Sequence, residues 1–192
     1  MRRFGSNIMF RSGCLRWWVA AAFAFILMFA SSGMQAQQTR TREYNIKAVF
    51  LYNFTQFVEW PEEAFANNTA PFVVGILGED PFRSVIDVTV AGEKVKEHPI
   101  IVRRYSNIKD LSTCHILFIS ETEAQKFLRS PAATKNKYML TVSDAAGFAN
   151  SGGMIRFVMQ ENKIKLQINP TVAKTAELNI SSKLLRLADI VE

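Results

Sequence analysis

The stretch Glu43–Pro61, EYNIKAVFLYNFTQFVEWP, is long, apolar and sharply ended, and we expect the rest of the fold to be organised around it. Placed at 100° per residue, it predicts an amphipathic helix with one apolar arc. The arc holds Ile46, Phe50, Leu51, Phe54, Phe57 and Val58, and the opposite side holds Asn45, Thr55, Gln56 and Glu59. Lys47 interrupts the arc in the first turn, where its long stem is expected to reach water. Pro61 ends the helix, and we expect the arc to pack on a sheet.

Four short apolar runs downstream, each bounded by turn residues, predict buried strands. They are Phe72–Leu77, Pro99–Arg104, Cys114–Ser120 and Tyr138–Val142. A helix is expected between the first two strands, from Phe82 to Val90, with Asp80 as its N-cap and Pro81 in its first position. A strand, a helix and a second strand in this order favour a right-handed crossover, and therefore a parallel sheet.

Further helices are expected later in the chain. One runs from Ser120 to about Arg129, with a capping box between Ser120 and Glu123, and Pro131 closes it. A short helix begins at Asn169-Pro170. The last predicted helix is Ser181–Val191. Its apolar face carries Leu184, Leu187, Ala188 and Val191.

The segments Met154–Met159 and Lys163–Ile168 alternate in polarity and predict an antiparallel hairpin. One face is expected to join the core, and it carries Ile155, Phe157, Met159, Ile164, Leu166 and Ile168. The predicted fold class is therefore α/β. It is a three-layer helix–sheet–helix sandwich, with a mostly parallel sheet and a C-terminal antiparallel hairpin at its edge.

The beginning of the chain has the composition of an export signal. Four arginines precede an apolar run, Trp17–Ala30, which is short for a membrane span. Small residues follow, and we expect cleavage between Gly33 and Gln37, with an uncleaved anchor as the alternative. The predicted organisation is a signal peptide over residues 1–36 and one domain over residues 37–192, located in the periplasm.

The net charge and the number of cysteines are best considered for the exported chain, without the predicted signal peptide. Without the four arginines of the signal, 19 of the 23 Lys and Arg residues remain, against 17 Asp and Glu. A nucleic-acid-binding function thereby loses its main support. Cys14 leaves with the signal, so Cys114 has no partner for an internal disulfide. We expect Cys114 to be buried in its apolar strand.

Polar residues follow three of the predicted strands. In open parallel sheets, ligands bind beyond the carboxyl ends of the strands. The residues at these ends are Gly78, Asp80, Ser120 and Asp144. One interpretation is a ligand crevice lined by all four, and the other is simple capping of the helices that follow. The glycines match neither the dinucleotide-binding motif nor the phosphate loop.

The chain offers little that resembles an active site. Cys114 and His115 are neighbours on a strand, so their side chains point to opposite faces. The remaining histidine, His98, lies in a predicted loop, and a hydrolase using Cys114 and His98 is the enzymatic alternative. Two histidines and one cysteine do not make a zinc site. We therefore predict a non-enzyme that needs no metal or cofactor.

A binding protein needs an accessible surface, and the outer face of the hairpin is the candidate. Lys163 and Lys165 discourage edge-to-edge pairing there. The apolar residues beside them mark a contact patch in one interpretation, or are covered by a helix in the other. The candidate partner-binding residues are Met154, Arg156, Val158, Lys165, Gln167 and Asn169.

Several quoted segments also carry a family resemblance. They are YNIKAVFLYNFTQFVEWP from residue 44, GILGEDPF from residue 75, CHILFIS from residue 114, LTVSDAAGFANSGGMIRFV from residue 140 and LNISSKLLRLADIV from residue 178. Together, and in this order, they resemble the YfiR-like family of periplasmic proteins. Several relatives carry cysteine pairs that this chain lacks, so no disulfide-based redox role is expected here.

The resemblance implies a function that the residues alone do not. It implies a regulator that binds the periplasmic sensor domain of an inner-membrane diguanylate cyclase and represses it, which lowers cyclic-di-GMP and biofilm formation. An outer-membrane lipoprotein that sequesters the regulator is a second implied partner. The alternative is a small-ligand sensor that uses the strand-end crevice and feeds a histidine kinase or another membrane receptor. A homodimer is a further option, because two-fold pairs are common.

Overall fold

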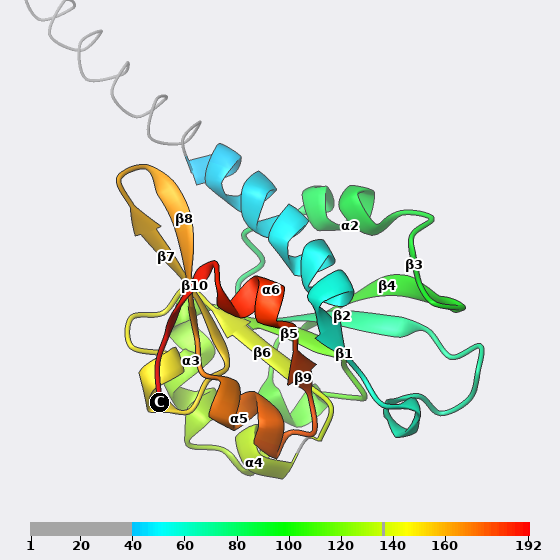
Figure 1. Cartoon of the computed structure of the whole chain (residues 1–192). Helices are drawn as coiled ribbons and strands as arrows, with labels where there is room; N and C mark the ends of the chain where they lie inside the picture. The colour runs from blue at the N-terminus through cyan, green and yellow to red at the C-terminus, as the bar shows by residue number, and fades with distance from the viewer. Residues whose placement is uncertain (1–39, 136) are drawn as a thin grey trace, which may run out of the picture. The chain divides into compact units, whose positions relative to one another are not determined.

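The structure is a computed structural model that describes residues 40–135 and 137–192 (Figure 1). The predicted signal peptide, residues 1–36, lies outside the described residues. Among the described residues, every helix is too short or too polar to span a bilayer. Residues Glu43–Glu192 form one compact unit.

The unit is built on an eight-stranded sheet with the order β10-β8-β7-β6-β5-β2-β4-β3. The strands are β2 (Phe72–Leu77), β3 (Lys94–Val95), β4 (His98–Tyr105), β5 (Ile116–Ile119), β6 (Leu140–Ser143), β7 (Ile155–Gln160), β8 (Lys163–Ile168) and β10 (Ala188–Ile190). Strand β2 pairs in parallel with β4 and β5, and the parallel pairing continues through β6 to β7. Strands β7 and β8 form the predicted antiparallel hairpin. The β2 segment has the predicted bounds, because its apolar run is closed on both sides by Pro71 and Gly78.

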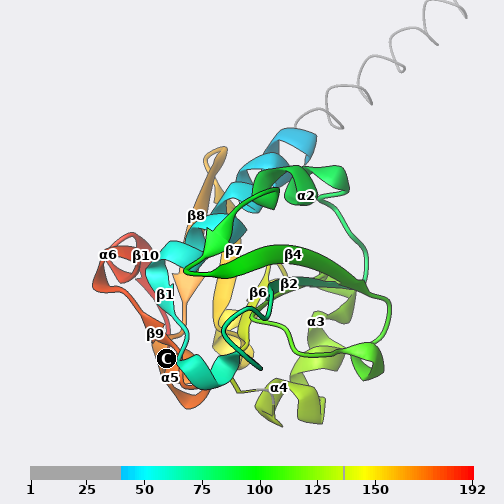
Figure 2. The same ribbon diagram turned by 90° about the vertical axis from the view of Figure 1, so that its right-hand side faces the viewer.

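Helices cover both faces of this sheet. The N-terminal helix occupies residues 40–57. The others are α2 (Ser84–Val90), α3 (Glu121–Leu128), α4 (Pro131–Lys135), α5 (Pro170–Thr175) and α6 (Ser182–Leu185), with 3-10 turns η1 (Glu62–Ala64), η2 (Ile108–Asp110) and η3 (Ala149–Ser151). The N-terminal helix and α2 lie on one side of the sheet, and α3 and α4 lie on the other (Figure 2). The predicted helix–sheet–helix sandwich is confirmed.

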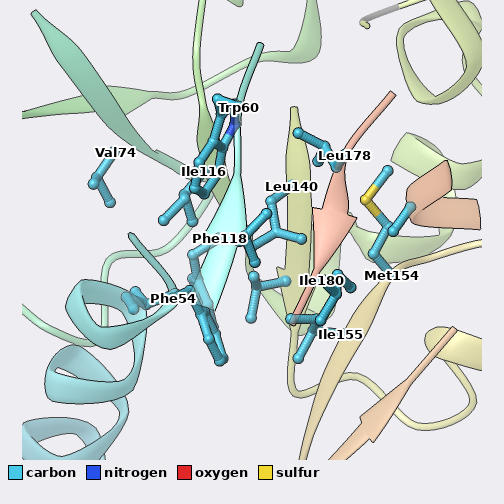
Figure 3. Packing of buried hydrophobic residues seen from close by; sticks show 14 of the residues in the cluster. Phe54, Trp60, Val74, Ile116, Phe118, Leu140, Met154, Ile155, Leu178 and Ile180 are labelled. Carbon is cyan, nitrogen blue, oxygen red and sulfur yellow. The ribbon is translucent and has the colours of Figure 1, made fainter. Parts of the chain in front are cut away.

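Each face of the sheet has its own hydrophobic core. The larger core joins the N-terminal helix to the sheet, and Figure 3 shows Phe54, Phe118 and Ile155 converging from the helix, β5 and β7. The smaller core lies under α3, where Phe127 packs with Leu77 and Leu117. Alternate residues of the buried strands β2 and β5 therefore serve opposite cores, as the period of two requires.

The N-terminal helix differs from its prediction in its end and in its buried face. It stops at residue 57, because Val58–Glu59 forms strand β1, which pairs antiparallel with β9 (Asn179–Ile180). Ile46 is 44% exposed, whereas Lys47 is only 3% exposed. The expectation that Lys47 reaches water is wrong, because a counter-charge from outside the helix, Asp144, allows its burial.

The C-terminal segment differs most from its predicted structure. The predicted helix Ser181–Val191 is wrong: α6 ends at Leu185, and Ala188–Ile190 becomes strand β10, parallel to β8. Leu187, assigned to the core by the helical period, is 77% exposed. Pairing with β8 satisfies backbone groups of both strands, and this long-range gain overrides the local helical pattern.

Two predicted helix boundaries also shift. Helix α2 begins at Ser84, later than expected, because Asp80 closes a turn ahead of the helix instead of capping it. Pro131 closes α3 as predicted but also opens α4, where proline suits the first turn. By contrast, the cap at Asn169 is confirmed: its side chain accepts a hydrogen bond from the Val172 N–H.

Candidate functional site

The sheet order places a topological switch point between β2 and β5. From β2 the chain moves first to β4 on one side and then to β5 on the other. Ligands of doubly wound folds bind at the carboxyl ends of the strands that flank such a point. Gly78 follows β2 and Ser120 follows β5, so the structure brings these two predicted crevice residues together.

The space at this switch point is filled by protein. A Cβ atom added to Gly78 would lie 2.2 Å from Oγ of Ser120 and 2.8 Å from Cγ of Glu123. The predicted capping box is wrong, because the Ser120 hydroxyl makes no capping bond. It instead hydrogen-bonds Oγ1 of Thr122 at 3.0 Å. Gly78 and Ser120 therefore meet in close packing, with no room between them for a ligand group.

Asp80, the third crevice residue, is engaged within its own loop. Its Oδ1 accepts hydrogen bonds from the N–H groups of Phe82 and Arg83, at 2.8 and 3.1 Å. Its Oδ2 accepts from Nε of Arg104 at 2.7 Å. Arg104 also pairs with Asp87 at 2.6 Å, and its hydrogen bonds hold the pKa of the Asp87 carboxyl below its usual range. Asp80 thus joins the start of α2 to β4.

Asp144, the fourth crevice residue, anchors the N-terminal helix. Its Oδ2 accepts hydrogen bonds from the Tyr44 hydroxyl at 2.7 Å and from Nζ of Lys47 at 2.9 Å. Lys47 also pairs with Glu43 at 2.5 Å and lies 4.3 Å from the centroid of the Tyr44 ring. The hydroxyl of Ser143, not Asp144, accepts the local N–H bond, from Ala145. The structure thus gives each of the four crevice residues an intramolecular role.

The cysteine and the histidines lie on opposite faces of the sheet. Cys114 belongs to the smaller core and is 5% exposed, and burial raises the pKa of its thiol to about 12. The ring of Phe65 stacks on His98 and on His115, with centroid distances of 3.7 and 4.7 Å, and it packs against the larger core. The predicted opposite orientation of Cys114 and His115 is confirmed, and a Cys114–His98 pair has no geometric support.

His115 is held as a neutral imidazole. Its Nδ1 accepts a hydrogen bond from the Val73 N–H at 3.0 Å, and Nε2 faces the Ala64 carbonyl at 3.1 Å. Because Nδ1 is an acceptor, the proton resides on Nε2. The pKa of His115 is lowered to about 4, mainly by burial and in smaller part by the nearby His98. Neither nitrogen is free for catalysis. In residues 40–135 and 137–192, no three His, Cys, Asp or Glu side chains cluster tightly enough to hold a metal.

The hairpin residues predicted to bind a partner divide into three groups. Lys165 is exposed, and Arg156, Val158 and Gln167 are half-buried. Nη1 of Arg156 donates a hydrogen bond to Oε1 of Gln167 at 3.1 Å, across the two strands. These four residues remain candidates for a contact surface.

The other two predicted partner-binding residues, Met154 and Asn169, are buried, at 4% exposure each. Their expected position on the surface is therefore wrong. Met154 precedes β7 and belongs to the larger core. Its N–H donates to Oγ1 of Thr141 at 3.1 Å and its carbonyl accepts from the N–H of Asn169 at 2.8 Å, so neighbouring segments enclose it. Asn169 caps α5 and donates to the Ala149 carbonyl at 3.2 Å.

A groove lies beside the hairpin that the sequence did not predict. Its volume is about 380 Å³, and we call it the β8–β10 groove. It is lined by Phe50, Ile164, Lys165, Leu166, Leu184, Arg186, Leu187, Ala188 and Asp189. Sequence reasoning missed it because the groove exists only when residues 188–190 form a strand. The one available signal was the mixture of leucines and cations in residues 184–187, which the helical pattern assigned to a core face.

Comparison with known protein families supports the resemblance that the sequence motifs indicate. The model of a family described as YfiR/HmsC-like matches residues 44–189, which is most of the chain. The resemblance predicted from the sequence is thereby confirmed. No curated protein matches the chain.

Proposed function

This chain belongs to the YfiR/HmsC-like family, and from that premise we propose that it represses an inner-membrane diguanylate cyclase by binding the cyclase's periplasmic sensor domain. The family is a periplasmic family of regulators without catalytic activity, and membership is consistent with a role in cyclic-di-GMP signalling. The observation that carries the proposal is the extent of the match, from residue 44 to residue 189. An outer-membrane lipoprotein that sequesters the regulator is the second partner we propose.

The chemistry of the site supports a binding function over a catalytic one. The thiol of Cys114 is buried and its pKa is raised, which leaves it a poor nucleophile. The nitrogens of His115 are both engaged with the backbone. Asp80 and Asp144 are occupied by ion pairs. The remaining candidates for a functional site lie on the surface, and they include the β8–β10 groove and the exposed side chains beside it.

The proposal is tested by deleting the gene and measuring cellular cyclic-di-GMP. We expect the level to rise and to return to normal when the wild-type gene is restored. Cross-linking of the tagged protein in the periplasm, read by mass spectrometry, should capture an inner-membrane protein with a cyclase output domain. An unchanged cyclic-di-GMP level, in cells where the protein was shown to be expressed before deletion, contradicts the proposal.

A second candidate function is a small-ligand sensor that feeds a histidine kinase or another membrane receptor. The β8–β10 groove favours it, because its volume of about 380 Å³ falls in the range of small-molecule sites. The strand-end residues do not, since each has an intramolecular partner. Capture of a histidine kinase in the cross-linking experiment, with unchanged cyclic-di-GMP after deletion, would favour the sensor over the cyclase regulator.

A further inference from the structure

The outer edge of β8 is only partly covered. On its inner side, β8 pairs with β7 along its whole length, from Lys163 to Ile168. On its outer side it pairs with β10 only from Leu166 to Ile168. Within the described part of the chain, the outer edge of the segment Lys163–Lys165 therefore has no strand partner. Unpaired strand edges are the sites where a further strand can add to a sheet.

The backbone groups of Ile164 point to this open edge. The carbonyl of Ile168 accepts a hydrogen bond from the Val191 N–H, so the backbone of Ile168 faces outward. In an antiparallel ladder this orientation repeats every second residue, so the N–H and C=O of Ile164 also face outward. They lie beside the groove, since Ile164 is one of its lining residues. The edge thus offers one donor and one acceptor for an added strand.

The lining of the groove beside this edge combines apolar side chains with two cationic ones. Phe50 of the N-terminal helix, Ile164 and Leu184 supply apolar lining, and Leu187 is 77% exposed. The side chains of Lys165 and Arg186 form no hydrogen bond or ion pair with any other described residue. The lining includes a single acidic residue, Asp189. Its formal charge is therefore positive.

We propose that the β8–β10 groove binds an extended, acidic and apolar segment of a partner protein, which adds to the sheet edge at Lys163–Lys165. The segment's backbone pairs with Ile164, an apolar side chain packs against Phe50, and carboxylates face Lys165 and Arg186. This inference rests on the proposed function, in which the chain binds a protein. A small molecule would fill the groove but would leave the backbone edge unpaired, which is why an extended peptide fits better.

Two variants separate backbone pairing from folding. Ile164→Pro removes the outward N–H, and it leaves the β7 ladder intact because that N–H does not point toward β7. Ile164→Val is its matched control, since it keeps the N–H. The double variant Lys165→Glu/Arg186→Glu reverses the charge of the groove. Its matched control is Lys109→Glu/Arg129→Glu, which reverses two exposed cations outside the groove.

The first arm of the test pans the exported protein against a phage-displayed library of random 12-residue peptides. We expect enrichment of peptides in which apolar and acidic residues alternate. Their affinity should fall at least tenfold with Ile164→Pro and with the groove charge reversal, and should be unchanged in both controls. Circular dichroism establishes that each variant is folded. Enrichment of no peptide, or of peptides that bind both test variants as well as wild type, overturns the inference.

The second arm restores each variant to the deletion strain and measures cyclic-di-GMP. Loss of repression by the two test variants alone supports the inference. If deletion raises cyclic-di-GMP but both test variants repress fully, the proposed function stands and the groove assignment is overturned. If deletion has no effect while peptide binding still depends on the groove, the cyclase proposal fails and the groove assignment stands. A homodimer that the charge reversal dissociates would assign the groove to a second copy and overturn the inference.

Discussion

The ammonium nitrogen of Lys47 lies 2.9 Å from Oδ2 of Asp144, and this ion pair ties the N-terminal helix to the carboxyl end of β6. The Lys47 side chain is 4% exposed and that of Asp144 is 16% exposed. The Tyr44 hydroxyl donates a second hydrogen bond to the same carboxylate oxygen. An ammonium buried to this degree needs its acidic partners. Because Glu43 lies on the same helix as Lys47, the bond to Asp144 is the one that fixes how the helix docks on the sheet.

We predict that Asp144→Ala is strongly destabilising, because it leaves the Lys47 ammonium buried without this partner. The free energy of unfolding in urea should fall by about 3 kcal/mol, the scale measured when one member of a buried pair is removed. The double variant Lys47→Met/Asp144→Ala should recover part of the loss, since it removes the buried ammonium as well. A loss below about 1 kcal/mol, the usual value of a surface pair, would contradict the assignment.

Gly78→Ala should destabilise the protein more than Gly92→Ala, although both glycines have positive φ. Gly78 has φ +87° and a new Cβ would lie 2.2 Å from Oγ of Ser120, whereas Gly92 has φ +78° and open space. The backbone strain common to both is about 1 kcal/mol, and only Gly78→Ala adds a steric clash. Thermal unfolding of the two variants checks the ranking. Equal losses would show that β2 and β5 do not pack closely at this point.

Acid should weaken the fold through His115. The pKa of His115 is lowered from an ordinary 6.5 to about 4 in the folded protein. Below pH 6.5 the unfolded chain therefore binds a proton that the folded protein does not. The free energy of unfolding is at its full value above pH 6.5 and falls as the pH drops toward 4, by up to about 1.4 kcal/mol per pH unit.

Urea unfolding at several pH values between 6.5 and 5 measures this slope. The variant His115→Gln retains hydrogen-bonding groups but has no imidazole to protonate, so its slope should be smaller than that of wild type. Comparing the two proteins at each pH cancels the contribution of the carboxylates. Identical slopes would mean that His115 is protonated equally in the folded and unfolded states.

Cys114 should be unreactive in the native protein. Its thiol pKa of about 12, against an ordinary 9.0, means a roughly thousandfold smaller thiolate fraction at pH 8. Burial at 5% exposure hinders attack further. With Ellman's reagent we expect negligible reaction of the exported protein in buffer and one equivalent in guanidinium chloride. Reaction in buffer at the rate of free cysteine would reopen the hydrolase alternative.

Features whose causes are local could be predicted from the amino-acid sequence. The run Phe72–Leu77 forms β2 with the predicted bounds, because turn residues close it on both sides. The turn between β7 and β8 contains Glu161 and Asn162, both with positive φ, and the alternating strands around it fix the hairpin. Asn169 caps α5 through its own side chain. The family resemblance also lies in the sequence, because it follows from motifs in a fixed order.

Where a local pattern competes with a distant partner, the conformation depends on tertiary contacts that the sequence pattern does not reveal. Lys47 is buried because Asp144, 97 positions away in the chain, supplies the counter-charge. Residues 188–190 form a strand because β8 offers backbone groups that a helix there would leave unpaired. The groove follows from that choice, together with the open edge at Ile164. A periodic pattern records which side of an element is apolar, but the hydrogen bonds and charges that settle its conformation come from segments that only folding brings together.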